Sequence, residues 1–81
     1  MKVKQFYTKN QFLIENEEGI YFQSYNSLIA VRRRDGRIEL DEKFWDYSNT
    51  TGKYRNLFLN ETKNETEAKI KSGEYTLTNL N

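Results

Sequence analysis

The side chains best suited to bind a ligand are four arginines around a predicted hairpin turn and two tyrosines that precede them. They are Tyr21, Tyr25, Arg32, Arg33, Arg34 and Arg37. Guanidinium groups beside exposed aromatic rings suit single-stranded nucleic acid, because bases stack on the rings and the phosphates meet positive charge. Arginines at a hairpin tip are also often simply solvated, and they protect an edge strand from aggregation. The residue types alone leave both interpretations open.

Two groups of acidic residues are candidates for acid–base chemistry or for binding a hard cation. They are Asp41, Glu42 and Asp46, and Glu15, Glu17 and Glu18. Either role requires that burial or like-charge proximity move the pKa values of the carboxyl groups apart. Because these residues fall at predicted strand ends and turns, we expect them to be solvated. Their spacing also differs from that of an EF-hand loop.

A turn rich in hydroxyl groups, residues 48–52, opens a predicted helix. Ser48 is the candidate N-cap, whose hydroxyl accepts from a backbone N–H group of the first helical turn. A helix N-terminus also binds anions, so a phosphate contact is the alternative, although the P-loop pattern is absent. Just before the turn, Phe44, Trp45 and Tyr47 are predicted to pack mostly in the core. An exposed ring among them would suit a protein partner.

The composition excludes several function classes. The 81 residues carry 13 Lys and Arg against 12 Asp and Glu, a net charge of +1, so no overall field marks a nucleic-acid binder. The absence of cysteine and histidine removes thiolate chemistry, the commonest general base and the commonest transition-metal ligand. We therefore expect no metal, no cofactor and no enzymatic activity. Because no apolar run has the length of a signal peptide or a membrane span, we also expect a cytoplasmic protein that binds no membrane.

A series of strands must position these groups. The predicted strands are residues 3–8, 11–16, 20–25, 28–31 and 37–41. Lys9 and Asn10 form the first predicted turn, and residues 16–19 form the second. Asp35 and Gly36 predict a two-residue type I′ hairpin turn, in which both residues have positive φ. Residues 20–25 alternate so that both faces of that strand carry aromatic rings, and one face must be covered by something outside the sheet.

The hydrophobic period then changes from that of a strand to that of a helix. A helix is predicted at residues 50–59, with Tyr54, Leu57 and Phe58 on one apolar face. That face is apolar enough to pack on a sheet.

A second helix is predicted at residues 65–72, followed by a last strand at residues 75–80. Asn64 and Glu67 predict a capping box for this helix, and Gly73 ends it. The whole chain, 1–81, is thus predicted to be a single α+β domain of order β-β-β-β-β-α-α-β. Its sheet is small and mainly antiparallel, of about five to six strands, with two short helices near the C-terminus.

Several motifs resemble those of a known group of proteins. SYNSLIA at residues 24–30, WDYSNTT at 45–51, YRNLFL at 54–59 and the closing residues 70–81 carry the resemblance. The chain resembles a family of small uncharacterised proteins of bacteriophages and mobile elements from gut and Gram-positive bacteria. The resemblance implies a genomic setting and transfers no role to any residue.

That setting favours a non-enzymatic accessory protein that binds a host macromolecule. Small phage proteins without catalytic residues commonly occupy a surface of a host enzyme or defence complex, as anti-CRISPR and anti-restriction factors do. The leading hypothesis is therefore an inhibitor of a host protein or protein complex in the host cytosol, using the tyrosine face and the arginine hairpin. The alternative is a single-stranded nucleic-acid-binding module. An exposed edge strand in so small a domain also allows a homodimer.

Overall fold

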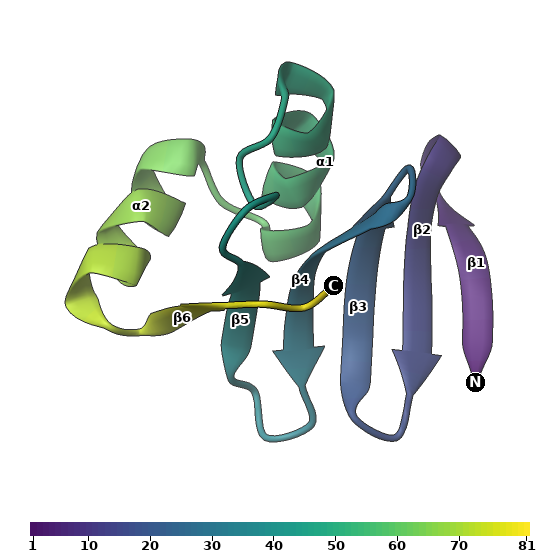
Figure 1. Cartoon of the computed structure of the whole chain (residues 1–81), viewed down its shortest axis with the longest axis horizontal. Coiled ribbons are helices and arrows are strands. Elements are labelled where there is room, and N and C mark those ends of the chain that lie inside the picture. The colour runs from purple at the N-terminus through teal and green to yellow at the C-terminus, as the bar shows by residue number, and fades with distance from the viewer.

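The computed structural model describes residues 1–81, which form one sheet and two helices (Figure 1). The elements are β1 (Lys2–Phe6), β2 (Thr8–Asn16), β3 (Gly19–Ser24), β4 (Ser27–Arg33), β5 (Ile38–Asp41), α1 (Asn49–Leu59), α2 (Lys63–Ser72) and β6 (Tyr75–Thr78). The strands lie in the sheet in their chain order, and each pair is antiparallel except β5 and β6, which run parallel. The predicted α+β fold and order of elements are confirmed.

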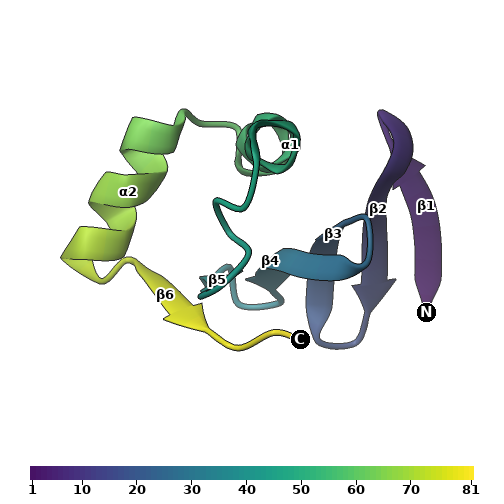
Figure 2. The ribbon, with the colours of Figure 1, turned by 45° about the horizontal axis from the view of Figure 1, so that its top comes forward.

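The helices lie on one face of the sheet and leave the other face without a covering helix (Figure 2). The strand register places Leu13, Phe22, Ala30 and Leu40 on the helix side, since directly paired residues share a face. There they meet Phe58 of α1 in the core. The buried members of this core are Phe22, Ile29, Ala30, Leu40, Phe58, Leu59 and Tyr75. Neither helix has the length and apolar content to span a membrane.

The hairpin between β4 and β5 is confirmed, but its turn differs from the predicted type I′. The Arg33 N–H group donates to the Arg37 carbonyl at 2.8 Å, so three residues form the loop. Gly36 donates to the Arg33 carbonyl at 3.0 Å, and Gly36 alone among the loop residues has positive φ, at 93°. This is the pattern of a type I turn followed by a left-handed glycine. One glycine therefore suffices, and Asp35 keeps an ordinary conformation.

The first predicted turn, at Lys9 and Asn10, is wrong. The chain reverses at Tyr7, whose φ is 68°, and β2 already begins at the next residue. The cause is aromatic packing: the Phe6 ring lies edge-on to the rings of Tyr7 and Phe22, which fixes the reversal beside the core. Asn10 keeps its turn-like conformation, with φ at 71°, inside the strand.

Helix α1 begins where expected but buries a different face. The Ser48 hydroxyl accepts from the Thr51 N–H group at 3.1 Å, which confirms the N-cap. The predicted apolar face is only partly correct, because Phe58 is buried whereas Leu57 is 42% exposed. A charged residue, Arg55, takes the buried position instead and is 1% exposed.

Helix α2 begins earlier than predicted. Its N-cap is Thr62, whose hydroxyl accepts from the Glu65 N–H group while the Glu65 carboxylate accepts from the Thr62 N–H group. The capping box is therefore formed by Thr62 and Glu65, and its prediction at Asn64 and Glu67 is wrong. Gly73 ends the helix in a left-handed conformation, as predicted.

The C-terminal residues that follow β6 are held to the sheet by hydrogen bonds. The Asn81 side chain accepts from the Leu28 N–H group at 2.8 Å and donates to the Leu28 carbonyl at 3.0 Å. An amide side chain thus takes the place of a neighbouring strand at the start of β4. Leu80 donates its N–H group to the Asp41 carboxylate at 2.8 Å.

Gly19 is the glycine that the fold tolerates least in substitution. Its φ is 145°, and a Cβ atom there would overlap the Arg32 carbonyl of the neighbouring strand, whereas a Cβ at Gly36 meets open space. We expect Gly19→Ala to lower the free energy of unfolding by at least about 3 kcal/mol, and Gly36→Ala, which bears only backbone strain, by about 1 kcal/mol. Urea unfolding followed by the fluorescence of the single tryptophan measures both. Equal losses in the two variants would contradict the close approach of β3 and β4.

Candidate functional site

The predicted arginine site is divided between the two faces of the sheet. Arg32 lies on the helix side, donates to the Phe58 carbonyl at 3.1 Å, and places its guanidinium 5.0 Å from the centre of the Phe58 ring. Arg33 lies on the opposite side and donates to the Tyr21 hydroxyl at 3.1 Å and to the Glu39 carboxylate at 2.8 Å. Donation to Glu39 raises the pKa of Arg33, against the opposing effect of burial.

The other two arginines are more exposed, yet each contacts an acidic side chain. Arg34 lies 3.7 Å from the Glu15 carboxylate and also donates to the Asn16 carbonyl at the end of β2. Arg37 donates to Asp35 at 2.7 Å. The basic β4–β5 turn therefore lies beside the acidic β2–β3 turn, which reduces its local positive charge.

Tyr25 does not join the arginines. It lies in the turn between β3 and β4, at the end of the sheet opposite to the β4–β5 turn (Figure 1), and is 53% exposed. The structure thus brings Tyr21 together with Arg33, and leaves Tyr25 apart.

A second polar cluster, which sequence reasoning missed, is built around Arg55. Its guanidinium donates to the Trp45 carbonyl at 2.7 Å, to the Asp46 carboxylate at 3.2 Å and to the Asn56 side chain at 2.9 Å. The same guanidinium lies 5.2 Å from the centre of the Trp45 ring. Its Nε atom is buried and has no hydrogen-bond partner. A buried donor without a partner is costly, so the hydrogen bonding of this guanidinium is incomplete.

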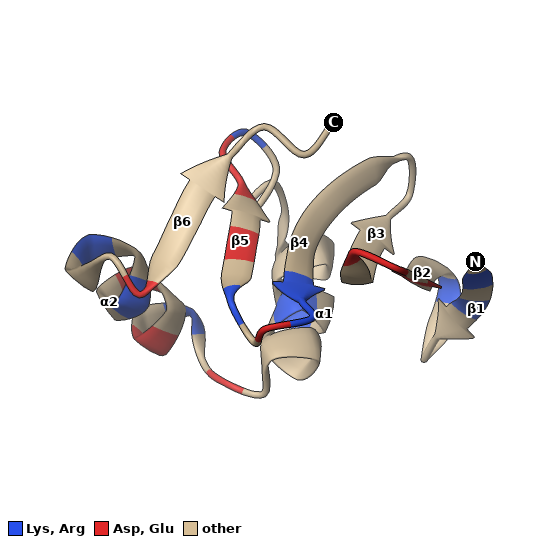
Figure 3. Cartoon of the chain, turned by 90° about the horizontal axis from the view of Figure 1, so that it is seen from below, with Lys and Arg blue, Asp and Glu red and all other residues tan.

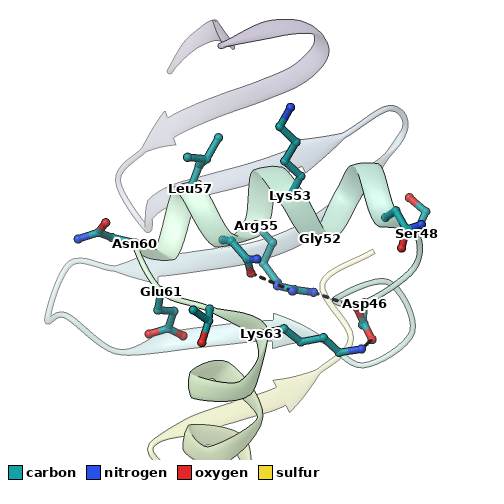
Figure 4. Close-up of a pocket in the computed structure, with 12 residues that line it drawn as sticks. Asp46, Ser48, Gly52, Lys53, Arg55, Leu57, Asn60, Glu61 and Lys63 are labelled. Atoms are coloured by element: carbon teal, nitrogen blue, oxygen red, sulfur yellow. Dashed lines mark hydrogen bonds and ion pairs between the residues drawn. The ribbon is translucent and has the colours of Figure 1, made fainter.

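A pocket of about 720 Å³ opens beside this cluster, between α1, the loop before it and the start of α2 (Figure 4). We call it the α1–α2 pocket. Arg55, Asp46 and Lys63 line it, and Lys63 lies 2.7 Å from the Asp46 carboxylate. Burial works to raise the pKa of Asp46, but hydrogen bonds and charge from Lys63 and Arg55 outweigh it and hold the pKa below its ordinary value of 3.8.

Glu61, between α1 and α2, links the two helices to strand β6 through hydrogen bonds. Its carboxylate accepts from Lys69 at 2.7 Å, from the Tyr75 hydroxyl at 2.9 Å and from the Thr66 hydroxyl at 2.5 Å. Burial opposes ionisation of this group, but these donors outweigh it, so the pKa of Glu61 is lowered. Every carboxylate oxygen contact here is internal, which makes this cluster structural.

The expectation that Asp41 is solvated is wrong. Asp41 is 1% exposed and accepts from the N–H groups of Lys43, Phe44 and Leu80 at 2.8 to 3.0 Å. Burial works to raise the pKa of Asp41, but these donors outweigh it and lower the pKa. Its partners come partly from the far C-terminus, which local turn patterns cannot reveal. No group of acidic side chains is arranged to hold a metal ion.

The aromatic rings before α1 divide as predicted, with Phe44 and Trp45 packed against the core and Tyr47 exposed. The exposed Tyr47 ring lies 5.4 Å from the Phe44 ring, centre to centre.

Comparison with known proteins places the chain in a family. A family model described as a family of unknown function (DUF8033) matches residues 1–75. The chain belongs to this family. The matched residues include the arginine hairpin and the whole α1–α2 pocket, so both candidate sites lie within the family's shared region. No curated protein and no solved structure matches the chain significantly.

Arg55 is expected to contribute strongly to stability. Arg55→Ala leaves the Trp45 carbonyl without its donor and removes one of the two cations at Asp46, so we expect a loss of about 3 kcal/mol in the free energy of unfolding. Lys53→Ala, on the exposed side of the same helix, is the control and should change stability by less than about 0.5 kcal/mol. Urea unfolding checks both variants. A loss in Arg55→Ala no larger than in the control would show that the buried guanidinium is dispensable.

The lowered pKa values of Asp41, Asp46 and Glu61 predict acid sensitivity. Because their pKa values are lower in the folded than in the unfolded chain, the stability they contribute is present above the unfolded values and is lost as the pH falls through the folded ones. With no histidine, stability should be flat between about pH 6 and 8 and should fall below about pH 4. Urea unfolding at a series of pH values tests this, and Asp41→Asn should make the acid loss shallower. An unchanged slope in that variant would contradict the role of Asp41.

Proposed function

We propose that this chain is a non-enzymatic binding protein that contacts a protein partner through the helix-free face of its sheet. The observation that carries the proposal is a row of apolar residues on that face. Val3, Ile14, Tyr21 and Val31 are paired directly across the first four strands. Val3 is 57% exposed, Ile14 and Tyr21 are partly exposed, and Val31 is fully buried between its neighbours. We call this surface the open face.

A second row extends the open face. Phe12, Gln23 and Leu28 are paired across β2, β3 and β4, and the Phe12 and Leu28 side chains are both partly exposed. An antiparallel sheet with one free face normally turns polar residues to solvent, whereas this face mixes these apolar residues with the polar Gln5, Gln23 and Glu39. Partly exposed apolar side chains in two adjacent rows support a protein–protein interaction site on this face. Seen from below, β4 ends in basic residues, β5 carries acidic residues and β6 carries no charged residue (Figure 3).

The polar groups at the border of this face suit a protein interface. Arg33 lies 5.7 Å from the centre of the Tyr21 ring and is held by Glu39, so an arginine, a tyrosine and a carboxylate stand together at the edge of the apolar rows. Tyrosine and arginine contribute most to binding energy at protein interfaces. Because Arg33 is already oriented by Glu39, it loses little conformational entropy on binding.

The partner we propose is a host protein or protein complex, and the role is that of a phage or mobile-element inhibitor of host defence. The resemblance of the SYNSLIA and WDYSNTT motifs to small phage proteins supports this setting. A cytoplasmic location and the absence of a cofactor or catalytic activity belong to the same proposal. A second copy of the chain is the other protein that the open face or the edge strand β1 could accept.

Single-stranded nucleic acid is the second candidate. The observation that favours it is the exposure of Arg34 and Arg37, whose side chains are both more than half accessible to solvent. Against it stand the ion pairs of both residues with Glu15 and Asp35, and the separation of Tyr25 from the hairpin. We therefore place protein binding first.

The test compares two variants that each add acidic charge to an exposed apolar site. Val3→Glu changes the open face, and Leu57→Glu changes the helix layer. We expect a partner purified from a host lysate on the immobilised protein to bind Val3→Glu at least about tenfold more weakly, and Leu57→Glu as tightly as the wild type. Calorimetry with the purified partner measures the affinities. Equal affinity for both variants would contradict the open face as the interface.

A matched measurement separates the nucleic-acid alternative. Labelled single-stranded DNA and RNA are titrated at two salt concentrations against the wild type and an Arg34→Ala, Arg37→Ala variant. Nucleic-acid binding falls steeply with salt and is lost in that variant, whereas an apolar protein interface is little affected by salt. Salt-sensitive binding that the double variant abolishes would overturn the protein-partner proposal.

A further inference from the structure

We propose that the α1–α2 pocket binds a small molecule that carries a phosphate group, with Arg55 and Lys63 as its cationic contacts. The pocket lies on the helix layer, away from the open face, so this inference does not rest on the proposed protein interface. An unpaired donor, two helix ends and an excess of cations meet in this pocket.

Arg55 has incomplete hydrogen bonding inside the chain. Three internal acceptors occupy its two terminal nitrogens, but Nε has none, although the residue is 1% exposed and lines the pocket. The neighbouring Gly52 adds no side chain over the guanidinium, where a Cβ atom would lie 3.5 Å from a terminal nitrogen of Arg55. Nε and the adjacent terminal nitrogen form the edge of a guanidinium that binds oxyanions in a bidentate manner.

The N-termini of both helices meet at this pocket. The N-caps Ser48 and Thr62 both line it. The N–H groups of Lys63 and Asn64, in the first turn of α2, have no hydrogen-bond partner within the chain. Helix N-termini carry partial positive charge and free donors, which together favour anions.

The charged residues of the lining are unevenly balanced. Arg55 and Lys63 supply the cations beside Asp46, whereas Lys53 points away from them, and Asp46 and Glu61 supply the carboxylates. Glu61 is already satisfied by Lys69, Thr66 and Tyr75, so only Asp46 balances the cations of the pocket. The lining therefore favours an anion. Figure 4 shows the Lys63 side chain reaching Asp46 beside the Arg55 guanidinium, with Lys53 on the solvent side of α1.

Size and polarity restrict the ligand further. A volume of about 720 Å³ falls in the range of small-molecule sites, and Leu57 is the one hydrophobic residue of the lining. An apolar ligand would find little surface to contact. A phosphate suits this site because it offers several acceptor oxygens, which can take bonds from Arg55 Nε, from Lys63 and from the free N–H groups of α2 at once.

The test is an NMR titration of the folded, nitrogen-labelled protein with inorganic phosphate. We expect saturable shifts of the amide signals of Lys63 and Asn64 and of the Arg55 Nε–H signal. Lys63→Met should weaken phosphate binding by about tenfold, the effect of losing one charge-assisted hydrogen bond. Lys71→Met removes a cation near the other end of α2 and should leave binding unchanged.

Further arms identify the source of the phosphate and guard against misfolding. A nucleoside monophosphate that shifts the same signals with higher affinity than inorganic phosphate supports a small phosphorylated ligand. Oligonucleotide binding that leaves these signals unmoved, or the absence of saturable shifts with phosphate, overturns the proposal. Equal weakening by Lys63→Met and Lys71→Met overturns it as well, since it indicates unspecific charge attraction. Val3→Glu changes only the open face, so it should bind phosphate like the wild type. The phosphate titration therefore tests the pocket separately from the proposed protein interface.

Discussion

A buried guanidinium fixes helix α1 against the loop that leads into it. Arg55 lies between the Gly52 turn of its own helix and the Trp45 ring, and it holds the Trp45 carbonyl and the Asp46 carboxylate. Because Asp46 in turn binds Lys63, a single side chain orders the loop before α1, the helix itself and the start of α2. Removing a charge from such a group of partners is costly since the remaining groups stay buried without compensation.

Buried charged side chains also join other distant segments of the chain, where few apolar residues are available for packing. Asp41 joins the end of β5 to the C-terminal tail at Leu80, and Glu61 joins the helix connection to Tyr75 in β6. A domain of 81 residues buries a small core, so contacts between distant segments depend more on complete hydrogen-bond sets than in larger proteins. Hydrogen bonds are directional, and each set therefore specifies one partner and one geometry.

These polar sets also explain what could be predicted from the sequence. Alternating residues, the Asp35–Gly36 turn and the cap at Ser48 are local signals, and they gave the strands, the hairpin and the start of α1. Arg55 and Asp41 resemble solvated residues in their local context, because each also depends on a distant partner. The Trp45 carbonyl lies ten positions from Arg55, and Leu80 lies 39 positions from Asp41. The predicted binding residues divide for a similar reason. Adjacent arginines in a strand point to opposite faces, so Arg32 and Arg33 cannot act on one ligand surface.

The helix layer and the free side of the sheet differ in the kinds of side chain that they carry. The helix layer is held by charged and hydroxyl side chains over a small apolar core, whereas the free side of the sheet keeps Ile14, Tyr21 and Phe12 without a covering element. In an isolated chain this exposed apolar surface gains no burial energy and favours aggregation. A surface of that kind is useful to a protein only when something covers it. Because the helix layer is stabilised independently of that face, a partner can bind there without rearranging the fold, and the pocket beside Arg55 stays accessible on the opposite layer.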